Sequence, residues 1–340
     1  MIWSPSLSNG LVTIVGGSGF VGRYIAQRMA RRGWRVRVAV RRPNQALFVQ
    51  TYGVVGQVRP VQCNIRDEDS MRRVLMGSDA VVNCVGVLWE GRWNRFDSVH
   101  VEGAARVARL AAEQGARHLV HFSAIGADPE SDSAYGRSKA EGERAVLDAF
   151  PEAVILRPSL VFGPEDDLFN RFAGMTRFTP VLPIVGADTR FQPVWVEDVA
   201  AAAAKGATGE VPPAIYELGG PRVATFREMM ELMLEIIRRR RLIVNIPFGL
   251  ARLQARLLQL TALVGLEPML TVDQVQMLGR DNVVADGAAG FDALGIQPTA
   301  MEAVLESYLY AYRRYGQYAH LAAPDAAGGR LHGGAAGEPR

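Results

Sequence analysis

A strand, a glycine-rich turn and a helix follow one another near the start of the chain. The apolar run at 11–15 predicts a short buried strand, and a helical pattern occupies 21–32. Gly16, Gly19 and Gly22 join the two at three-residue spacing. Glycines there permit a tight turn, close approach of backbone to phosphate, and close packing of helix on strand. The free N–H groups of the helix start then face an anion. The residues expected to hold a dinucleotide pyrophosphate are Gly16, Gly19, Phe20, Val21 and Gly22.

Apolar runs separated by helical segments continue through the first half of the chain. Further strands are expected at 34–40, 58–63, 80–86, 118–124 and 154–156. This alternation implies crossover units and a parallel sheet, with ligands bound beyond the carboxyl ends of the strands. We predict an α/β fold, namely a Rossmann-type doubly wound parallel sheet with a smaller, mostly helical C-terminal domain. The predicted parts are 8–160 for the nucleotide-binding domain, 161–320 for the smaller domain interleaved with the last strands, and 321–340 for a disordered tail.

Composition narrows the class of protein. A net charge of +3 over 340 residues argues against a protein that works by coating nucleic acid. Cys63 and Cys84 are expected on neighbouring buried strands, without a disulfide framework or a metal site. The first ten residues lack the features of a signal peptide, and no long apolar stretch is free of charges. We therefore expect a cytoplasmic protein.

The choice between the two nicotinamide dinucleotides depends on the end of the second strand. An acidic residue there would bind the ribose hydroxyls of NAD, but this chain has Arg41 and Arg42. Arginine suits a 2′-phosphate through forked, charge-assisted hydrogen bonds, so we favour NADP(H) over NAD(H). The alternative is that both arginines only form a solvated strand end. The other residues expected to contact the cofactor are Asn64, Ile65, Val85, Gly86, Tyr135, Lys139 and Pro158.

Three residues further along form a candidate catalytic group. Tyr135 and Lys139 are one helical turn apart on the same face, and Ser123 ends the fifth predicted strand. A nearby ammonium favours the phenolate, so we expect the Tyr135 pKa to be lowered towards a value useful for proton transfer. Ser123 would hold a substrate carbonyl or alcohol. The alternative is a chance pair at a partly exposed helix start.

These motifs, in this order, resemble the extended and atypical short-chain dehydrogenase/reductases. The resemblance continues through 156–164, 191–200 and 216–220 and reaches to about residue 320. The segments 38–43, 123–129 and 162–172 are similar to the nucleotide-binding accessory subunits of respiratory complex I and their bacterial relatives. This narrower resemblance implies tightly held NADPH with a structural role, away from the electron path to quinone.

The chain departs from the wider family at two positions. Val15 stands where threonine is common before the first glycine, and Asn64 stands where many members have aspartate. Asn64 can still hydrogen-bond adenine. The chain lacks any clear pattern for a sugar nucleotide or another named substrate.

The second half of the chain is less regular. Residues 169–183 are expected to cover the site as a loop and helix. A leucine-rich helix is expected at 248–266, after a basic cluster at 238–241. This helix would lie on a membrane surface or a membrane-bound partner, or would cover the smaller domain with its polar residues facing water. A last helix is expected at 301–315.

Two functions of different classes follow. The favoured one is an NADP(H)-binding accessory or assembly subunit of respiratory complex I or a related quinone-linked assembly. Its partners would be complex I subunits or the inner face of the cell membrane. The alternative is an active NADP(H)-dependent reductase or epimerase/dehydratase, with quinone biosynthesis as one setting. Tyr135 would then transfer a proton, Lys139 would lower its pKa, and Ser123 would position the carbonyl.

Overall fold

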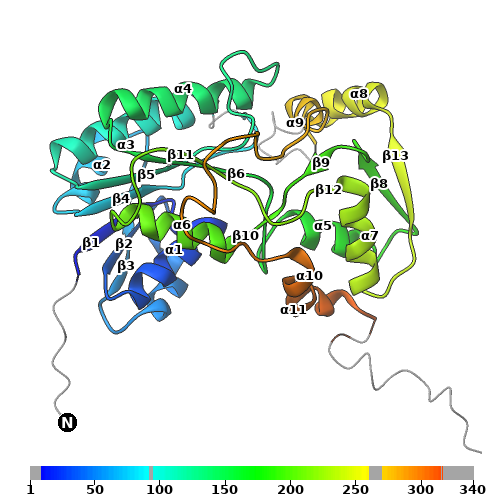
Figure 1. Cartoon of the computed structure of the whole chain (residues 1–340), viewed down its shortest axis with the longest axis horizontal. Helices are drawn as coiled ribbons and strands as arrows, with labels where there is room; N and C mark the ends of the chain where they lie inside the picture. The colour runs from blue at the N-terminus through cyan, green and yellow to red at the C-terminus, as the bar shows by residue number, and fades with distance from the viewer. Residues whose placement is uncertain (1–8, 92–94, 260–269, 315, 317–340) are drawn as a thin grey trace, which may run out of the picture.

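A computed structural model describes residues 9–91, 95–259, 270–314 and 316, and its centre is a seven-stranded sheet (Figure 1). The strands run in the order β11-β6-β5-β4-β1-β2-β3, and every neighbouring pair is parallel. Their bounds are β1 Leu11–Val15, β2 Arg35–Val40, β3 Val58–Gln62, β4 Ala80–Asn83, β5 His118–Phe122, β6 Val154–Pro158 and β11 Ile215–Leu218. The predicted Rossmann-type doubly wound sheet is confirmed.

Helices cover both faces of this sheet, and each face has its own apolar core. One face packs against α1 (Phe20–Arg31) and α6 (Val196–Ala207). The other face packs against α2 (Glu68–Leu75), α3 (Glu102–Glu113) and α4 (Ala134–Ala149). Both faces of the central strands are therefore buried, which explains their nearly continuous apolar sequences. Since α6 and β11 lie beyond residue 160, the chain returns to the first lobe after entering the second.

Side-chain caps explain where two of these helices begin. Asp67 accepts a hydrogen bond from the Ser70 backbone N–H at 3.1 Å and starts α2. Ser133 accepts one from the Gly136 backbone N–H at 3.2 Å and starts α4. A 3-10 helix, η1 (Pro43–Tyr52), follows β2, and a π-helical turn, η2 (Asp97–Val101), leads into α3.

The order of the strands reverses at β1, because β4 pairs on one side of it and β2 on the other. Such a switch point leaves a crevice at the carboxyl ends of the strands, where ligands bind in open α/β sheets. The reversal also corrects one expectation. Cys63 follows β3 and Cys84 follows β4, and these strands are separated by β1 and β2, so the cysteines are not on neighbouring strands.

The second lobe has a separate core built around α5 (Leu168–Met175) and α7 (Phe226–Ile236). Its remaining strands are β7 Val161–Phe162, β8 Val181–Val185, β9 Arg190–Phe191, β10 Val194–Trp195, β12 Ala224–Thr225 and β13 Leu242–Ile246. The helix expected at 301–315 is broken into α10 (Met301–Val304), α11 (Glu306–Leu309) and η4 (Tyr310–Tyr312). The segment 169–183, expected to cover the site, packs in this second core instead.

Two helices, α8 (Phe248–Gln259) and α9 (Val272–Met277), pack on each other beside the second core. Ala251 and Ala255 form the buried side of α8, whereas Leu250, Leu253 and Leu257 are more than half exposed. Arg252, Gln254 and Arg256 are exposed as expected for polar residues that face water, but these leucines are exposed beside them. No helix in the described part of the chain is long and apolar enough to cross a membrane. The rest of the predicted 248–266 helix and the predicted tail 321–340 lie outside the described residues.

Candidate functional site

The glycine turn lies at the switch point between β1 and α1. Gly16 has a φ of +79°, a conformation that favours glycine, and its N–H donates to the Ala39 carbonyl at 2.9 Å. A Cβ on Gly22 would lie 2.7 Å from both the Gly16 oxygen and the Gly17 Cα. Only a glycine at position 22 therefore lets α1 approach the turn this closely.

The N-terminus of α1 is open to an anion. Gly19 is the N-cap residue and offers no side-chain hydrogen bond to the helix. The backbone N–H groups of Phe20, Val21 and Gly22 lie in the first turn of α1. They have no carbonyl partner within the helix. Together with the helix dipole, these groups fit a pyrophosphate.

The predicted adenosine end lies at the ends of β2 and β3. Arg41, Asn64 and Arg73 line one surface hollow of about 550 Å³, which is large enough for part of a nucleotide. The Asn64 side-chain oxygen accepts the Arg66 backbone N–H at 3.2 Å, while Ile65 is buried in the core. Arg42 is exposed at the start of η1 and does not line this hollow.

The segment after β4 lies between the glycine turn and α4. A Cβ on Gly16 would lie 3.0 Å from Val85, and a Cβ on Gly86 would lie 3.5 Å from Lys139 Nζ. The buried Asn83 fixes this segment, because its side-chain oxygen accepts the Val85 N–H at 3.2 Å. Backbone without side chains at Gly86 leaves room for the ring or ribose of a dinucleotide. Pro158 ends β6, two strands from β4 at the same edge of the sheet.

The three candidate catalytic residues lie directly after β5 and on α4. Ser123 is buried, and its hydroxyl oxygen makes no hydrogen bond within the described structure. Lys139 Nζ donates to the Phe122 carbonyl at 2.9 Å and lies 5.9 Å from the centre of the Tyr135 ring. An ammonium has three donors and a hydroxyl both donates and accepts, so Ser123 and Lys139 retain hydrogen-bonding capacity for a ligand.

The electrostatics of Tyr135 are opposite to our expectation. Burial, and secondarily the carboxylate of Asp273, raise the pKa of the Tyr135 phenol to about 12. Burial lowers the pKa of Lys139 to about 8, against the opposing effect of Glu143. Because the Lys139 ammonium is turned to a backbone carbonyl, it does not stabilise the phenolate enough to offset burial. In this state the phenol holds its proton at neutral pH.

Sequence reasoning missed Asp273, which acts on α4 from the second lobe. Its carboxylate accepts hydrogen bonds from the Ser133 hydroxyl at 2.9 Å and from the Ala134 and Tyr135 N–H groups at 2.7 and 3.2 Å. A carboxylate at a helix N-terminus is favourable. Asp273 thereby fixes the backbone at Tyr135. The capping box of Thr271 and Gln274 marks the start of α9 in the sequence, but no local signal identifies its target 138 residues away.

His100 is a second residue that the sequence did not single out. Its Nε2 accepts the Val87 N–H at 3.0 Å, so its Nδ1 carries the proton and donates to the Ser138 hydroxyl at 2.9 Å. Burial, followed by the charge of Lys139, lowers the His100 pKa to about 3, which keeps the ring neutral. The ring contacts Tyr135 edge to face, with centroids 5.5 Å apart. This residue connects the segment after β4 to α4.

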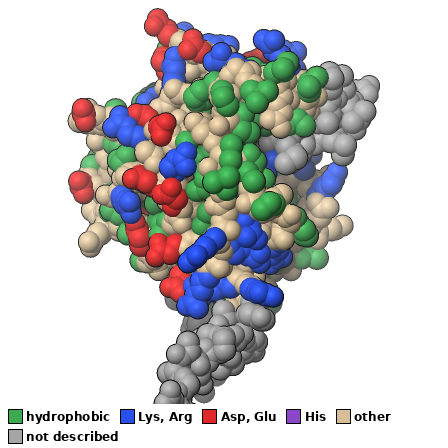
Figure 2. All heavy atoms as spheres, turned by 90° about the vertical axis from the view of Figure 1, so that its right-hand side faces the viewer, with side chains coloured by type: hydrophobic (Ala, Val, Ile, Leu, Met, Phe, Trp, Pro, Cys, Tyr) green, Lys and Arg blue, Asp and Glu red, His purple; other side chains and the backbone are tan. Residues whose placement is uncertain are grey.

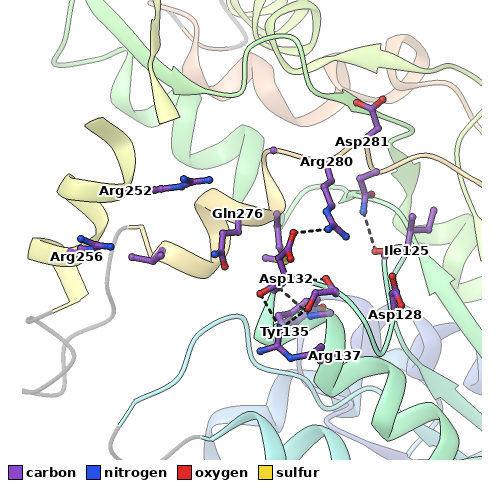
Figure 3. Close-up of a pocket in the computed structure, with 18 residues that line it drawn as sticks. Ile125, Asp128, Asp132, Tyr135, Arg137, Arg252, Arg256, Gln276, Arg280 and Asp281 are labelled. Carbon is purple, nitrogen blue, oxygen red and sulfur yellow. Dashed lines mark hydrogen bonds and ion pairs between the residues drawn. The ribbon is translucent and has the colours of Figure 1, made fainter. Parts of the chain in front are cut away.

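A cavity of about 790 Å³ extends from Tyr135 and Gly136 to α8 and α9 (Figure 3). Arg252 extends from α8 towards it, and Arg280 forms an ion pair with Asp132 at 2.7 Å across it. Both lobes therefore contribute to the space next to the candidate catalytic residues. Such a cavity is large enough for a small organic molecule.

A largely buried ionic network fastens α4 to the sheet. Arg157, at the end of β6, bonds both carboxylate oxygens of Glu143 at 2.6 and 2.8 Å. It also reaches Glu217 of β11 at 3.3 Å, and Glu217 accepts the Ala285 N–H at 2.9 Å. Glu143 follows Lys139 by one turn of α4, so the network supports the helix that carries the candidate catalytic pair.

Comparison with known proteins identifies the architecture. The sequence model of the NAD dependent epimerase/dehydratase family matches residues 12–219, from β1 through the end of β11. The chain belongs to this family. Membership supports binding of a nicotinamide dinucleotide, and the open α1 terminus and the hydroxyl of Ser123 fit that group. No cluster of three or more metal-binding side chains occurs among the described residues.

Individual relatives resemble the chain over both lobes. The mitochondrial NADH dehydrogenase (ubiquinone) 1 alpha subcomplex subunit 9 of Arabidopsis thaliana is 34% identical over 323 residues, which cover 92% of this chain and 80% of that protein. The subunit of the same name from Rattus norvegicus is 32% identical, covering 91% and 82%. A dTDP-glucose 4,6-dehydratase from Bacillus anthracis, solved with NAD, has a TM-score of 0.68 at 15% identity, covering 89% and 96%. That likeness extends the shared fold to the second lobe.

Proposed function

We propose that this protein is an NADP(H)-binding accessory or assembly subunit of respiratory complex I or a related quinone-linked assembly. The observation that carries the proposal is similarity to NADH dehydrogenase (ubiquinone) subunits over about nine-tenths of the chain. That similarity includes α7 and α8 of the second lobe, which lie beyond the region matched by the general family. A subunit that binds a partner must keep such surfaces as well as its nucleotide site.

Association with complex I is tested in cell membranes solubilised with a mild detergent. We expect the protein to co-migrate with complex I subunits in native gels and to leave the cytoplasmic fraction in part for the inner face of the membrane. Salt washing without detergent serves as a control for loose adsorption. Recovery only in the soluble fraction, never with complex I subunits, would contradict the proposal.

NADP(H) is proposed as the bound dinucleotide, because two arginines line the hollow at the predicted adenosine end. Arg41 and Arg73 line it together with Asn64, and a 2′-phosphate there would receive charge-assisted hydrogen bonds. We expect Arg41→Ala to weaken NADPH binding about tenfold, as for loss of one such hydrogen bond, and to leave NADH binding within twofold. Fluorescence titration with both nucleotides measures this difference.

The matched control for this experiment is Arg59→Ala, a change on the neighbouring strand β3 that removes an arginine not lining the hollow. Arg42→Ala tests the second predicted arginine, which lies outside the hollow. Equal loss of NADPH and NADH affinity in Arg41→Ala, or NAD(H) as the co-purifying nucleotide, would contradict the choice of NADP(H).

A second function is supported by the unpartnered hydroxyl of Ser123 beside Lys139. Here the protein is an NADP(H)-dependent reductase or epimerase/dehydratase. Ser123 would bind a carbonyl oxygen, Tyr135 would supply the proton, and Lys139 would orient the ribose. The cofactor would supply the hydride. Turnover of the co-purifying nucleotide with added quinones, abolished in Tyr135→Phe, would favour this function. A raised Tyr135 pKa with Asp273 in place favours retention of the proton instead.

A further inference from the structure

The outer side of the second lobe exposes large apolar side chains. Figure 2 shows hydrophobic residues running down this face, with arginine side chains gathered at its lower end. Phe178 is 89% exposed and Leu242 is 65% exposed, values unusual for such residues. We call the following set the outer apolar band: Phe178, Val181, Leu242, Val244, Leu250, Leu253 and Leu257.

Most of the band lies on two consecutive elements, β13 and α8. In β13, Leu242 pairs with Val181 of β8 and faces outward, while Ile243 packs on the second core. One residue, Pro247, then separates β13 from α8. In α8 the exposed leucines recur at spacings of three and four, on the side opposite the buried alanines. Phe178 lies in the turn between α5 and β8, and the other members of the band lie on β8, β13 and α8.

An arginine cluster, consisting of Arg177, Arg239, Arg240 and Arg241, adjoins the lower end of the band. Arg239 and Arg241 both donate to the Thr176 carbonyl at the end of α5, and Arg177 donates to the Ala311 carbonyl. In the described part of the chain, none of the four forms an ion pair with a carboxylate. The pKa of Arg239 is lowered by burial and then by the like charges of Arg241 and Arg177. The cluster therefore carries positive charge that its surroundings do not neutralise.

We propose that the outer apolar band and the arginine cluster bind the surface of a lipid bilayer that contains anionic phospholipids. Binding at a membrane surface requires exposed apolar side chains beside basic ones. The apolar side chains enter the boundary between headgroups and acyl chains, and the basic side chains bind lipid phosphates. Because the positive charge of the cluster is uncompensated, we favour anionic lipid as the molecule that binds this surface. The biological setting rests on the proposed function, but lipid binding is testable without complex I.

The purified full-length protein is mixed with vesicles of phosphatidylcholine alone, and with vesicles in which phosphatidylglycerol replaces part of it. We expect co-sedimentation with the anionic vesicles, weakened by added salt. Phe178→Glu is expected to reduce the vesicle partition coefficient about tenfold or more, because a large apolar contact is lost. Arg240→Glu, in an exposed side chain, is expected to reduce it about fivefold or more.

Two control variants lie on the first lobe. Val55→Glu changes an equally exposed apolar residue, and Arg144→Glu reverses an exposed charge on α4. Both should bind vesicles like the unmodified protein. Circular dichroism and NADPH titration confirm that each variant is folded.

Failure to sediment with either kind of vesicle would overturn the inference, as would equal losses in band and control variants. The band variants could stop co-migrating with complex I subunits while the unmodified protein binds neither kind of vesicle. In that case the band binds a protein, and the inference is wrong. Vesicle binding by a protein that never accompanies complex I would sustain the inference and contradict the proposed function. The two proposals can therefore fail separately.

Discussion

Gly22→Ala is expected to remove most of the dinucleotide affinity. The added Cβ would lie 2.7 Å from the Gly16 oxygen and the Gly17 Cα, which are backbone atoms that cannot rotate away. Helix α1 must then move off the turn, and the N–H groups at its start move with it. Overpacking of this kind costs about 1–3 kcal/mol, so we expect affinity for NADPH to fall about 5- to 150-fold. Fluorescence titration and thermal unfolding with and without NADPH measure both effects.

Gly249→Ala is the matched control, because a Cβ at that position in α8 would meet no atom within 4 Å. Alanine should be neutral or slightly stabilising there, as expected for glycine replaced inside a helix. Unchanged NADPH affinity in Gly22→Ala would mean that the dinucleotide does not use the α1 terminus. The same result would contradict the predicted contacts of Gly16, Gly19 and Phe20.

Replacing Arg157 by methionine is expected to destabilise the fold by about 3–5 kcal/mol. The variant leaves the carboxylates of Glu143 and Glu217, which are 5% and 11% exposed, without their cation. Removing one partner of a buried ion pair costs more free energy of folding than the intact pair contributes, because the remaining charge stays desolvated. Urea unfolding at pH 7 measures the change. Arg144→Met, which breaks a 4.0 Å surface pair with Asp148, should cost less than about 1 kcal/mol.

The pH dependence distinguishes this cause from simple loss of packing. Without Arg157, the two unpaired carboxylates are costly to keep charged in the folded variant, because they are desolvated there and hydrated in the unfolded chain. The folded variant then binds more protons than the unfolded chain, so its stability deficit shrinks as the pH falls from 7 towards 5. Glu143→Gln combined with Arg157→Met should recover part of the loss at pH 7. A deficit independent of pH, or one below about 1 kcal/mol, would show that the network is not the cause.

The sheet and its ligand edge could be predicted because their signals are local. The apolar runs and the glycine spacing each occupy a few residues. Right-handed crossovers then place successive strands in one parallel sheet, with Ser123 and Gly86 at the same edge. Errors arose where a feature depended on strand order, as for Cys63 and Cys84, which the reversal at β1 separates.

The second lobe was predicted less well, because its elements depend on packing partners distant in the sequence. The helix expected at 301–315 is broken into short pieces that pack on α5 and α7. The leucines of α8 have helical spacing, but spacing does not say which side is buried. That choice is made by the small Ala251 and Ala255, which let α8 approach its neighbours.

The sequence by itself determined the doubly wound sheet, the dinucleotide turn and the family, since each is encoded in short contiguous segments. Only the tertiary structure determined the electrostatics of the candidate site and which side chains the second lobe exposes. Asp273 reaches α4 from 138 residues away, and burial raises the pKa of Tyr135. The leucines of α8 are exposed because the opposite side of the helix, with Ala251 and Ala255, packs against the protein. Desolvation and exposure of a side chain depend on which elements pack against each other, and a local sequence pattern does not contain this information.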